Sequence, residues 1–239
     1  MELVRILSAG AAKGLVQALA GPFEAERGSR VDATFDSAGA ISNAVVARTA
    51  CDLVILPAAM LDTLAVQALI DGETIAALGR VPTGIAIRSG DASPDVHDAD
   101  ALRAALGRAS ELYCPDTSRS TAGIHFAGVL RTLGLHEKLS PRLRAYANGA
   151  QAMAALAANG AAGAIGCTQV TEILYTPGVL FVAVLPPPFE LTTLYALAVT
   201  TSVRASADAR AFAERLTGPS SQLVRRAGGG FLDHPAPRS

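Results

Sequence analysis

The stretch that decides the fold is VRILSAGAAKGLVQAL, residues 4–19. Its short apolar run stops at Ser8, and after a turn of small residues the apolar positions resume at helical spacing. This pattern predicts a strand, a tight turn and a helix whose first amides face outward. Those amides have no partner within the helix, so the turn can bind an anion or simply pack closely. The glycine spacing matches neither a dinucleotide-binding motif nor a P-loop.

The same pattern recurs along the first third of the chain. Residues 31–35 predict a second strand, followed by the polar turn DSAG and a helix over 40–48. Residues 52–56 predict a third strand, followed by a helix over 60–70. Repeated units of this kind favour a parallel sheet with helices on its faces. Ligands of such sheets bind beyond the carboxyl ends of the strands, where both polar turns lie.

The chain changes character near residue 80, where a long strand over 81–88 predicts a passage into a second lobe. We expect an α/β fold with lobe I at 1–80 and 190–239 and lobe II at 81–189. Each lobe is predicted to be a mainly parallel sheet flanked by helices. Two passages between the lobes predict a ligand cleft that can close.

The second lobe has its own strand, turn and helix units. A strand over 111–114 leads into a polar loop over 115–123 and a helix over 124–133, which places His125 in the first helical turn. Later predictions are strands over 142–147, 162–167, 179–184 and 191–202, helices over 151–158, 205–216 and 220–226, a short helical segment opening at 168–172 and a loose tail over 234–239.

Composition limits the functions to consider. The chain has 239 residues, 50% of them hydrophobic, and a formal net charge of −1. Without a broad basic field, nucleic-acid binding is not expected. Cys51, Cys114 and Cys167 lie far apart without a CxxC motif, which is typical of buried small apolar residues. The histidines show no metal-binding spacing, so we expect no metal and no cofactor.

The first residues predict the location of the protein. Glu2, Arg5 and Lys13 interrupt any pattern of an export signal, so we expect a cytoplasmic protein, or a periplasmic one if this is a trimmed mature form. No run of about 18 uncharged apolar residues occurs, so membrane insertion is not expected.

Five motifs occur in the order SAGAAKGLVQAL, FDSAGAISNAV, CDLVILPAA, STAGIHFAGVLRTLGL and NGAQAMAALAANGAAGAIG. In this order they resemble the molybdate-type extracellular solute-binding proteins of ABC transporters, over residues 3–200. The resemblance implies a two-lobe, type II periplasmic-binding-protein-like fold and a small anion in the cleft. It also implies an ABC transporter permease as partner if the protein is exported.

In that family, serine hydroxyls of the first two turns, helix-start amides and a tyrosine of the second lobe hold the oxyanion. Here the turns consist of Gly10-Ala11 and Ser37-Ala38-Gly39, and Thr168 or Cys167 stands near the tyrosine position. Each lost donor costs about 1–3 kcal/mol. These departures argue against molybdate itself and leave another oxyanion or a carboxylate as the expected ligand.

The resemblance places the anion at predicted helix starts near Ser8, Ser37, Ser120 and Thr168. Serine and threonine hydroxyls, amides and two cations are the expected donors. The ligand-binding candidates are Ser8, Gly10, Ala11, Lys13, Ser37, Ala38, Gly39, Arg119, Ser120, Thr121, Thr168 and Gln169.

The motifs DSAG, TAGIHF and TQVTEIL are similar to the aconitate isomerase branch of the same superfamily. This similarity implies an alternative function, a cytoplasmic isomerase of a small polycarboxylate that removes and returns a proton. His125 is then the candidate base, with Glu172 or Asp36 sharing the proton transfer. Each has a structural alternative: His125 as a packing residue, Asp36 as a helix cap and Glu172 as a solvated first-turn residue. Lys13 has the alternative of pointing to solvent.

Overall fold

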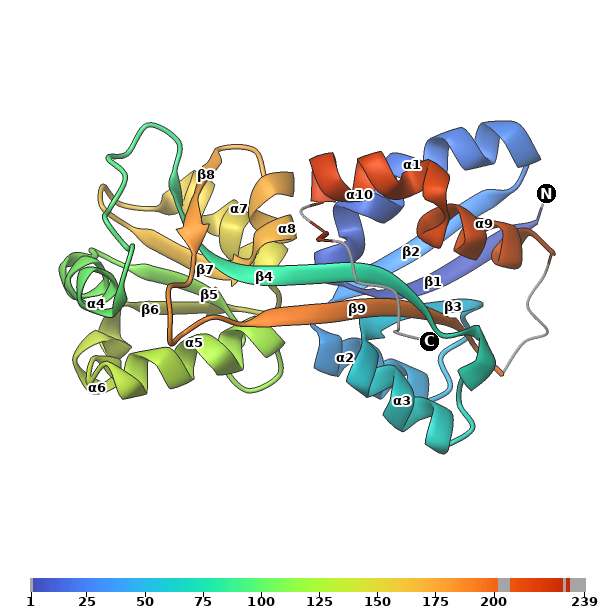
Figure 1. The fold of residues 1–239 in the computed structure, drawn as a ribbon, viewed down its shortest axis with the longest axis horizontal. Coiled ribbons are helices and arrows are strands. Elements are labelled where there is room, and N and C mark those ends of the chain that lie inside the picture. The colour runs from blue at the N-terminus through green and yellow to red at the C-terminus, as the bar shows by residue number, and fades with distance from the viewer. Residues whose placement is uncertain (1, 202–206, 230, 233–239) are drawn as a thin grey trace. The chain divides into compact units, whose positions relative to one another are not determined.

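The computed structural model describes residues 2–201, 207–229 and 231–232. The chain divides into two compact units, Met1–Val81 with Thr193–Ser239, and Pro82–Thr192 (Figure 1). The chain leaves the first unit within β4 (Ala76–Arg88) and re-enters it at the start of β9 (Thr192–Val199). The sequence places these passages near residues 80 and 190.

The sheet of the first unit has the strand order β2-β1-β3-β9. The central strand β1 (Leu3–Ala9) runs parallel to β2 (Arg30–Asp36) and β3 (Leu53–Pro57), whereas β9 runs antiparallel to β3. Every residue of β3 is buried. Its continuous apolar sequence is what a strand covered on both faces requires.

Helices cover both faces of this sheet. One face carries α1 (Lys13–Arg27), α9 (Ala207–Thr217) and α10 (Gln222–Gly229), and the other carries α2 (Ala38–Val46) and α3 (Ala58–Val66) (Figure 1). Three short 3-10 turns complete the unit: η1 (Gly10–Ala12), η2 (Gly72–Thr74) and η4 (Pro219–Ser221).

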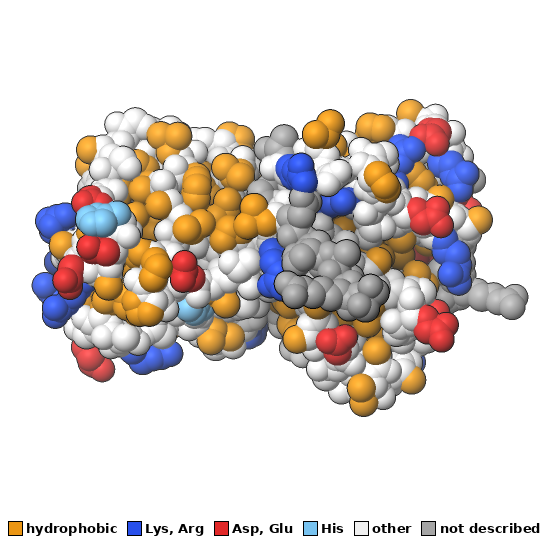
Figure 2. Space-filling view, viewed as in Figure 1, with side chains coloured by type: hydrophobic (Ala, Val, Ile, Leu, Met, Phe, Trp, Pro, Cys, Tyr) orange, Lys and Arg blue, Asp and Glu red, His pale blue; other side chains and the backbone are white. Residues whose placement is uncertain are grey.

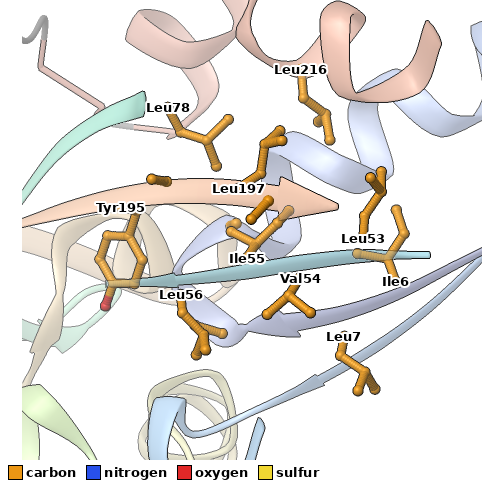
Figure 3. Packing of buried hydrophobic residues seen from close by; sticks show 14 of the residues in the cluster. Ile6, Leu7, Leu53, Val54, Ile55, Leu56, Leu78, Tyr195, Leu197 and Leu216 are labelled. Atoms are coloured by element: carbon orange, nitrogen blue, oxygen red, sulfur yellow. The ribbon is translucent and has the colours of Figure 1, made fainter. Parts of the chain in front are cut away.

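The core of the first unit is built around β3. Leu53 and Ile55 point to the face where Leu216 of α9 lies, and Val54 and Leu56 point to the opposite face (Figure 3). All five side chains are fully buried. Burial of one such side chain contributes about 1.5–3 kcal/mol. This packing fixes the carboxyl end of β1, where the first candidate turn begins.

The sheet of the second unit has the strand order β4-β7-β5-β6, with β8 on the other side of β4. Strands β6 (Leu143–Tyr146) and β7 (Ile165–Gln169) run parallel to β5 (Leu112–Pro115). Strands β7 and β8 (Val179–Val184) run antiparallel to β4. The carboxyl ends of β5, β6 and β7 therefore meet at one edge, the carboxyl edge of the second unit.

Two layers of helix cover this sheet. Its helices are α4 (Ala99–Arg108), α5 (Thr121–Thr132), α6 (His136–Leu139), α7 (Gly149–Asn159) and α8 (Val170–Tyr175), with the 3-10 turn η3 (Ser140–Arg142). Successive β4 residues serve different layers: Ile85 and Ile87 pack with Phe126 of α5, and Ala86 packs with Met153 of α7.

The surface carries charges of both signs. On the face shown in Figure 2, Lys and Arg side chains lie interspersed with Asp and Glu rather than gathered by sign. The edge strand β8 exposes Leu180, Phe181 and Val184. Across the described residues, no helix has the length and apolar character that crossing a bilayer requires.

The most important difference from the sequence prediction lies at α5. The helix begins at Thr121, ahead of the predicted start at residue 124, so His125 lies in the second turn. The polar small residues over 115–123 predict a loop up to Gly123. A Cβ at Gly123 would lie 2.4 Å from the Pro115 carbonyl and 2.3 Å from the Asp116 carbonyl. The close approach of helix and strand end therefore needs glycine inside the first turn.

The bounds of several other elements also differ from the sequence predictions. Ser8 lies inside β1 and Thr168 inside β7, so neither stands at a helix start. The helix predicted over 40–48 begins earlier, at Ala38, because Ser37 caps it. The strand predicted over 191–202 ends at Val199. Residues 202–206 and the predicted tail over 234–239 lie outside the described residues.

Candidate functional site

The first candidate turn follows β1 and offers backbone amides without a side-chain cap. Ser8 is fully buried, and its hydroxyl donates to the carbonyl of Ala9 at 2.9 Å. Gly10 and Ala11 form the buried turn η1 and bring no hydroxyl. Lys13 is half-buried and is the first residue of α1. Amides and one cation are thus the groups with which this turn can bind an anion.

In the second candidate turn, after β2, side chains of the turn itself accept the hydrogen bonds of its amides. The Ala40 amide donates to Ser37 Oγ at 3.3 Å, and the Ser37 amide donates to Asp36 Oδ1 at 2.7 Å. The side-chain cap of α2 is therefore Ser37, while Asp36 supports the residue that caps. Ala38 and Gly39 are the first helical residues and can offer amides only.

The first two turns lie at one edge of the first unit. The strand register pairs Ser8 with Phe35 and Ala9 with Asp36. Residues that are far apart in the sequence, in the Ser8 and Ser37 turns, are thereby brought to neighbouring strand ends.

The third candidate turn precedes α5 in the second unit. Ser120 is the N-cap of this 12-residue helix and has extended backbone geometry, yet its side chain makes no capping hydrogen bond. Thr121 follows as the first helical residue, and both side chains are half-buried. Ala122 and Gly123 complete a buried first turn. Two hydroxyls therefore accompany the amides at this helix start.

Asp116 organises the loop ahead of α5. Its Oδ1 accepts from the Ser118 hydroxyl at 2.6 Å and amide at 2.8 Å and from the Arg119 amide at 3.0 Å. The Arg119 guanidinium donates to Oδ2 through Nη2 at 2.8 Å and Nε at 3.1 Å. Hydrogen bonds from Ser118 and then Arg119 hold the pKa of Asp116 well below its usual range. A ligand contact by Arg119 would compete with this ion pair.

One ring nitrogen of His125, on α5, is a hydrogen-bond donor. Its Nε2 lies 2.8 Å from the carbonyl oxygen of Phe189. A carbonyl can only accept, so Nε2 carries the proton. Nδ1 of the neutral ring is then the nitrogen with a lone pair, and it is the atom that could act as a base.

Glu172 on α8 is buried and not solvated, which overturns the surface alternative for this residue. Its Oε2 accepts from the Thr168 hydroxyl at 2.5 Å. The backbone amides of Gln169, Ala150 and Gly149 also donate to this carboxylate. Burial raises the pKa of Glu172 to about 6, and these four donors oppose that rise.

Thr168 and Gln169, the fourth group of candidates, are both buried. The Thr168 hydroxyl is committed to Glu172, and the Gln169 amide donates to the same carboxylate. The helix that follows, α8, has six residues. The structure thus places these two residues around Glu172 at the carboxyl edge of the second unit.

The start of α7 is a part of this region that is absent from the sequence-based candidates. Asn148 is the N-cap, and its Oδ1 accepts from the Gln151 amide at 3.0 Å. Gly149 lies against Glu172: a Cβ there would be 1.9 Å from Oε2. An asparagine before an apolar helical stretch was the available signal for this helix start. The partner carboxylate, 23 residues further along, had no such signal.

Among the described ranges, no group of three or more His, Cys, Asp or Glu side chains could hold a metal ion. The three cysteines are buried and unpaired with one another. The candidate residues therefore offer amides, hydroxyls, the cations of Lys13 and Arg119, the imidazole of His125 and the buried carboxyl of Glu172 as chemically useful groups.

The model of the bacterial extracellular solute-binding protein family matches residues 4–229. The chain belongs to this family. Its fold agrees with solved two-lobe periplasmic binding proteins. One is the periplasmic molybdate-binding protein of Azotobacter vinelandii, with a TM-score of 0.78 and 18% identity, covering 97% of this chain and 100% of that chain. Another is the sulfate-binding protein of Mycobacterium tuberculosis H37Rv, with a TM-score of 0.72 and 16% identity, covering 96% of this chain and 86% of that chain.

This solute-binding protein also resembles an enzyme. It is 25% identical to an aconitate isomerase from a Pseudomonas species over 217 residues, which cover 88% of this chain and 80% of the relative. The family and the two-lobe fold are thus established, and the resemblance to molybdate-type binding proteins is confirmed at the level of the fold.

Proposed function

We propose that the protein binds a small anion, an oxyanion or a carboxylate, and that the start of α5 is its main contact in the second unit. The observation that carries the proposal is the uncapped Ser120 at the start of a 12-residue helix. Serine at this position normally accepts a hydrogen bond from a first-turn amide. Here the hydroxyls of Ser120 and Thr121 and the helix-start amides are the donors for the anion.

The N-caps of the other helices fall into two groups. Ser37, Asp98 and Asn148 each cap their helix with a side-chain oxygen, at α2, α4 and α7. The N-caps of α1, α3, α6 and α8 make no such bond, and they are Ala12, Pro57, Leu135 and Gln169. At α5 the N-cap is a serine that leaves the bond unmade, so its hydroxyl accompanies the first amides as a donor for an external anion.

The chemistry of the turns favours recognition by hydroxyls and amides over recognition by paired cations. Arg119 is engaged by Asp116, and its side chain is 60% exposed. The solved relatives named above bind molybdate and sulfate. Because Gly10 and Ala11 bring no hydroxyl to the first turn, we place molybdate itself below other oxyanions and carboxylates.

The test is a panel of molybdate, sulfate, phosphate, citrate and trans-aconitate, measured by thermal shift and calorimetry. We expect at least one anion to raise the melting temperature by mass action. The double variant Ser120→Ala/Thr121→Ala is expected to lose affinity about tenfold or more, since each lost donor costs about 1–3 kcal/mol. Thr117→Ala, in the same loop, is the matched control and should retain affinity. Unchanged affinity in the double variant would place the anion elsewhere.

The first unit has a separate test. If Lys13 contacts the anion, Lys13→Gln also weakens binding of the anion found in the panel. Normal affinity in this variant would mean that Lys13 is not a ligand contact.

A second candidate function is isomerisation of a small polycarboxylate. It is favoured by the 25% identity to an aconitate isomerase over 88% of the chain. The Nδ1 of His125 supplies a base whose tautomer is set by the Phe189 carbonyl. Proton transfer by that nitrogen would take an allylic proton from the substrate and return one at the other end of the shifting double bond.

Proton NMR with trans-aconitate in deuterated buffer separates the two functions. Appearance of the cis isomer, or deuterium in the methylene, is expected for an isomerase. His125→Gln keeps a donor for the Phe189 carbonyl and removes the base, so turnover should fall roughly a hundredfold while binding persists. A folded protein that binds trans-aconitate and shows neither change would leave the binding function alone.

The expected partner and the expected location of the protein depend on which of these two functions it has. A binding function implies an ABC transporter permease as the partner and a site of action outside the cytoplasm. An isomerase function implies work on a cytoplasmic metabolite. Fractionation of the native cells with an antibody against this chain tests both expectations.

A further inference from the structure

The start of α7 already holds an anion that belongs to the chain itself. The Glu172 carboxylate accepts from the Gly149 and Ala150 amides, which are the first two of this helix, and from the Gln169 amide. The Thr168 hydroxyl adds a fourth donor at 2.5 Å. This is the donor set expected around a bound oxyanion, with a side chain in the place of the ligand.

The cluster is closed as well as complete. Glu172 is 6% exposed, and Thr168 is fully buried. A Cβ at Gly149 would lie 1.9 Å from Oε2 of Glu172 and 2.1 Å from the Thr168 hydroxyl. An external anion therefore has no room at the start of α7 while Glu172 is in place.

We propose that Glu172 is a built-in anion that makes ligand binding by the second unit proton-linked, so that the protein takes up a proton on Glu172 when it binds an anion. The proposal rests on anion binding at the start of α5. Both places lie at the same carboxyl edge, because β5 pairs with both β6 and β7. Adjacent strands are about 4.8 Å apart, so the strand ends that lead to the two negative charges are neighbours, although α5 and α7 pack on opposite faces of the sheet.

The expected size of the coupling follows from Coulomb's law. Two unit charges about 10 Å apart at an effective dielectric constant of about 20 change a binding constant by roughly tenfold or more. Proton uptake removes this repulsion. Affinity for a permanently charged anion should therefore be highest in acid and fall as pH rises through the pKa of Glu172.

The elements packed against α8 add few titratable side chains around Glu172, whereas His125 lies on α5, the helix of the proposed anion site. The elements packed against α8 are α7, β7 and β8. Within α7 and β8 no side chain is titratable, β7 contributes Cys167 and α8 contributes Tyr175. Burial holds the pKa of Cys167 well above its usual value. A cysteine thiol with a raised pKa does not change charge in weak acid.

The experiment is calorimetry of the whole chain with sulfate and with trans-aconitate at pH 5.5, 6.5 and 8.0, in two buffers of different ionisation enthalpy. Sulfate keeps its charge over this range, so its affinity reports on the protein. We expect about tenfold weaker sulfate binding at pH 8.0 than at pH 5.5, with net proton uptake near pH 6.5. Glu172→Gln should bind sulfate with little pH dependence and no proton uptake.

Thr168 supplies the matched pair of controls. Thr168→Ser keeps the hydroxyl donor and should keep the wild-type pH profile. Thr168→Val removes a donor to the carboxylate, so its profile should shift to higher pH. Carbon NMR of the Glu172 carboxyl in the wild-type protein follows the same titration without any variant, and sulfate should move its midpoint upward.

The outcomes are distinct. Sulfate or trans-aconitate binding with a pH-independent affinity, or an NMR midpoint that sulfate leaves in place, would overturn the proton linkage and leave anion binding standing. Failure of all five anions of the panel, these two included, to bind at any pH would overturn the linkage together with the proposed function. A pH profile that survives in Glu172→Gln would assign the proton to another group.

Discussion

The starts of α5 and α7 are two solutions to one structural problem. Both helices follow neighbouring parallel strands, β5 and β6, at the carboxyl edge of the second unit. At α7, Asn148 caps the third amide, and Glu172 takes the first two. At α5, the N-cap Ser120 makes no side-chain bond. Side chains of the protein satisfy the start of α7, whereas at α5 the N-cap side chain does not, and we propose that a ligand does.

A fold with several helix starts at one edge can direct a ligand to one of these starts by satisfying the others with its own side chains. Unsatisfied amides are costly when buried, so each start needs an acceptor. A side-chain carboxylate fills one start permanently and adds a negative charge to the edge. In our proposal the remaining start receives the ligand, against a repulsion that protonation of Glu172 relieves.

The largest expected effect comes from forcing Glu172 out of the α7 start. Gly149→Ala places a methyl group within 1.9 Å of the Glu172 carboxylate and 2.1 Å of the Thr168 hydroxyl. We expect a loss of about 3 kcal/mol in the free energy of unfolding, at the upper end of overpacking costs. Urea denaturation followed by circular dichroism measures this change.

Gly128→Ala on α5 is the matched control, because a Cβ there meets nothing within 4 Å. Alanine is the better helix former, so this variant should gain about 0.5–1 kcal/mol. Equal stabilities for the two variants would mean that the Glu172 cluster is looser than its donor set indicates.

A smaller effect is expected from the ionisation of Glu172. Burial raises the pKa of Glu172 to about 6 in the folded protein, against about 4.3 for an exposed glutamate. The folded state thus binds this proton more tightly than the unfolded state does. The resulting stabilisation, about 2 kcal/mol, is fully present below the unfolded pKa and is lost as pH rises through about 6.

The difference in unfolding free energy between wild type and Glu172→Gln isolates this contribution from the other carboxyl groups. Relative to the variant, the wild type should be more favoured at pH 4 than at pH 7.5 by about 2 kcal/mol. Denaturation curves at both pH values provide the measurement. A difference that stays constant with pH would mean that Glu172 titrates alike in both states.

Short sequence patterns predict the helix start at α5, where the N-cap side chain makes no bond. They do not predict the contacts at the start of α7, which Glu172 occupies. Strands, small-residue turns and the hydroxyls of Ser120 and Thr121 are visible in single stretches, and the family motifs order them into two lobes. The contact between Glu172 and Gly149 joins residues on two different helices, so no short pattern announces it. Glu172 in a first helical turn is typical of a solvated residue, and only the packing of α7 against α8 buries it.

The same limit applies to His125. The sequence predicts that His125 lies on an apolar helix. However, α5 begins earlier than predicted, because Gly123 allows the helix to approach the Pro115 and Asp116 carbonyls closely. The partner that fixes its tautomer, Phe189, lies 64 residues away. Pairings of this kind come from tertiary structure, so the sequence offers the candidate residues but not the partners of their side chains.

The smallest expected effect distinguishes the two helix starts by removing the N-cap side chain of each. Asn148→Ala removes the cap on the Gln151 amide at 3.0 Å and should cost about 1 kcal/mol of stability. Ser120→Ala removes no capping bond, so its stability should change by less than about 0.5 kcal/mol. Ligand affinity should follow the reverse order, with Ser120→Ala weakening anion binding and Asn148→Ala leaving it nearly unchanged. If Ser120→Ala instead lowers stability as much as Asn148→Ala, the serine caps α5 in solution and the two starts are alike.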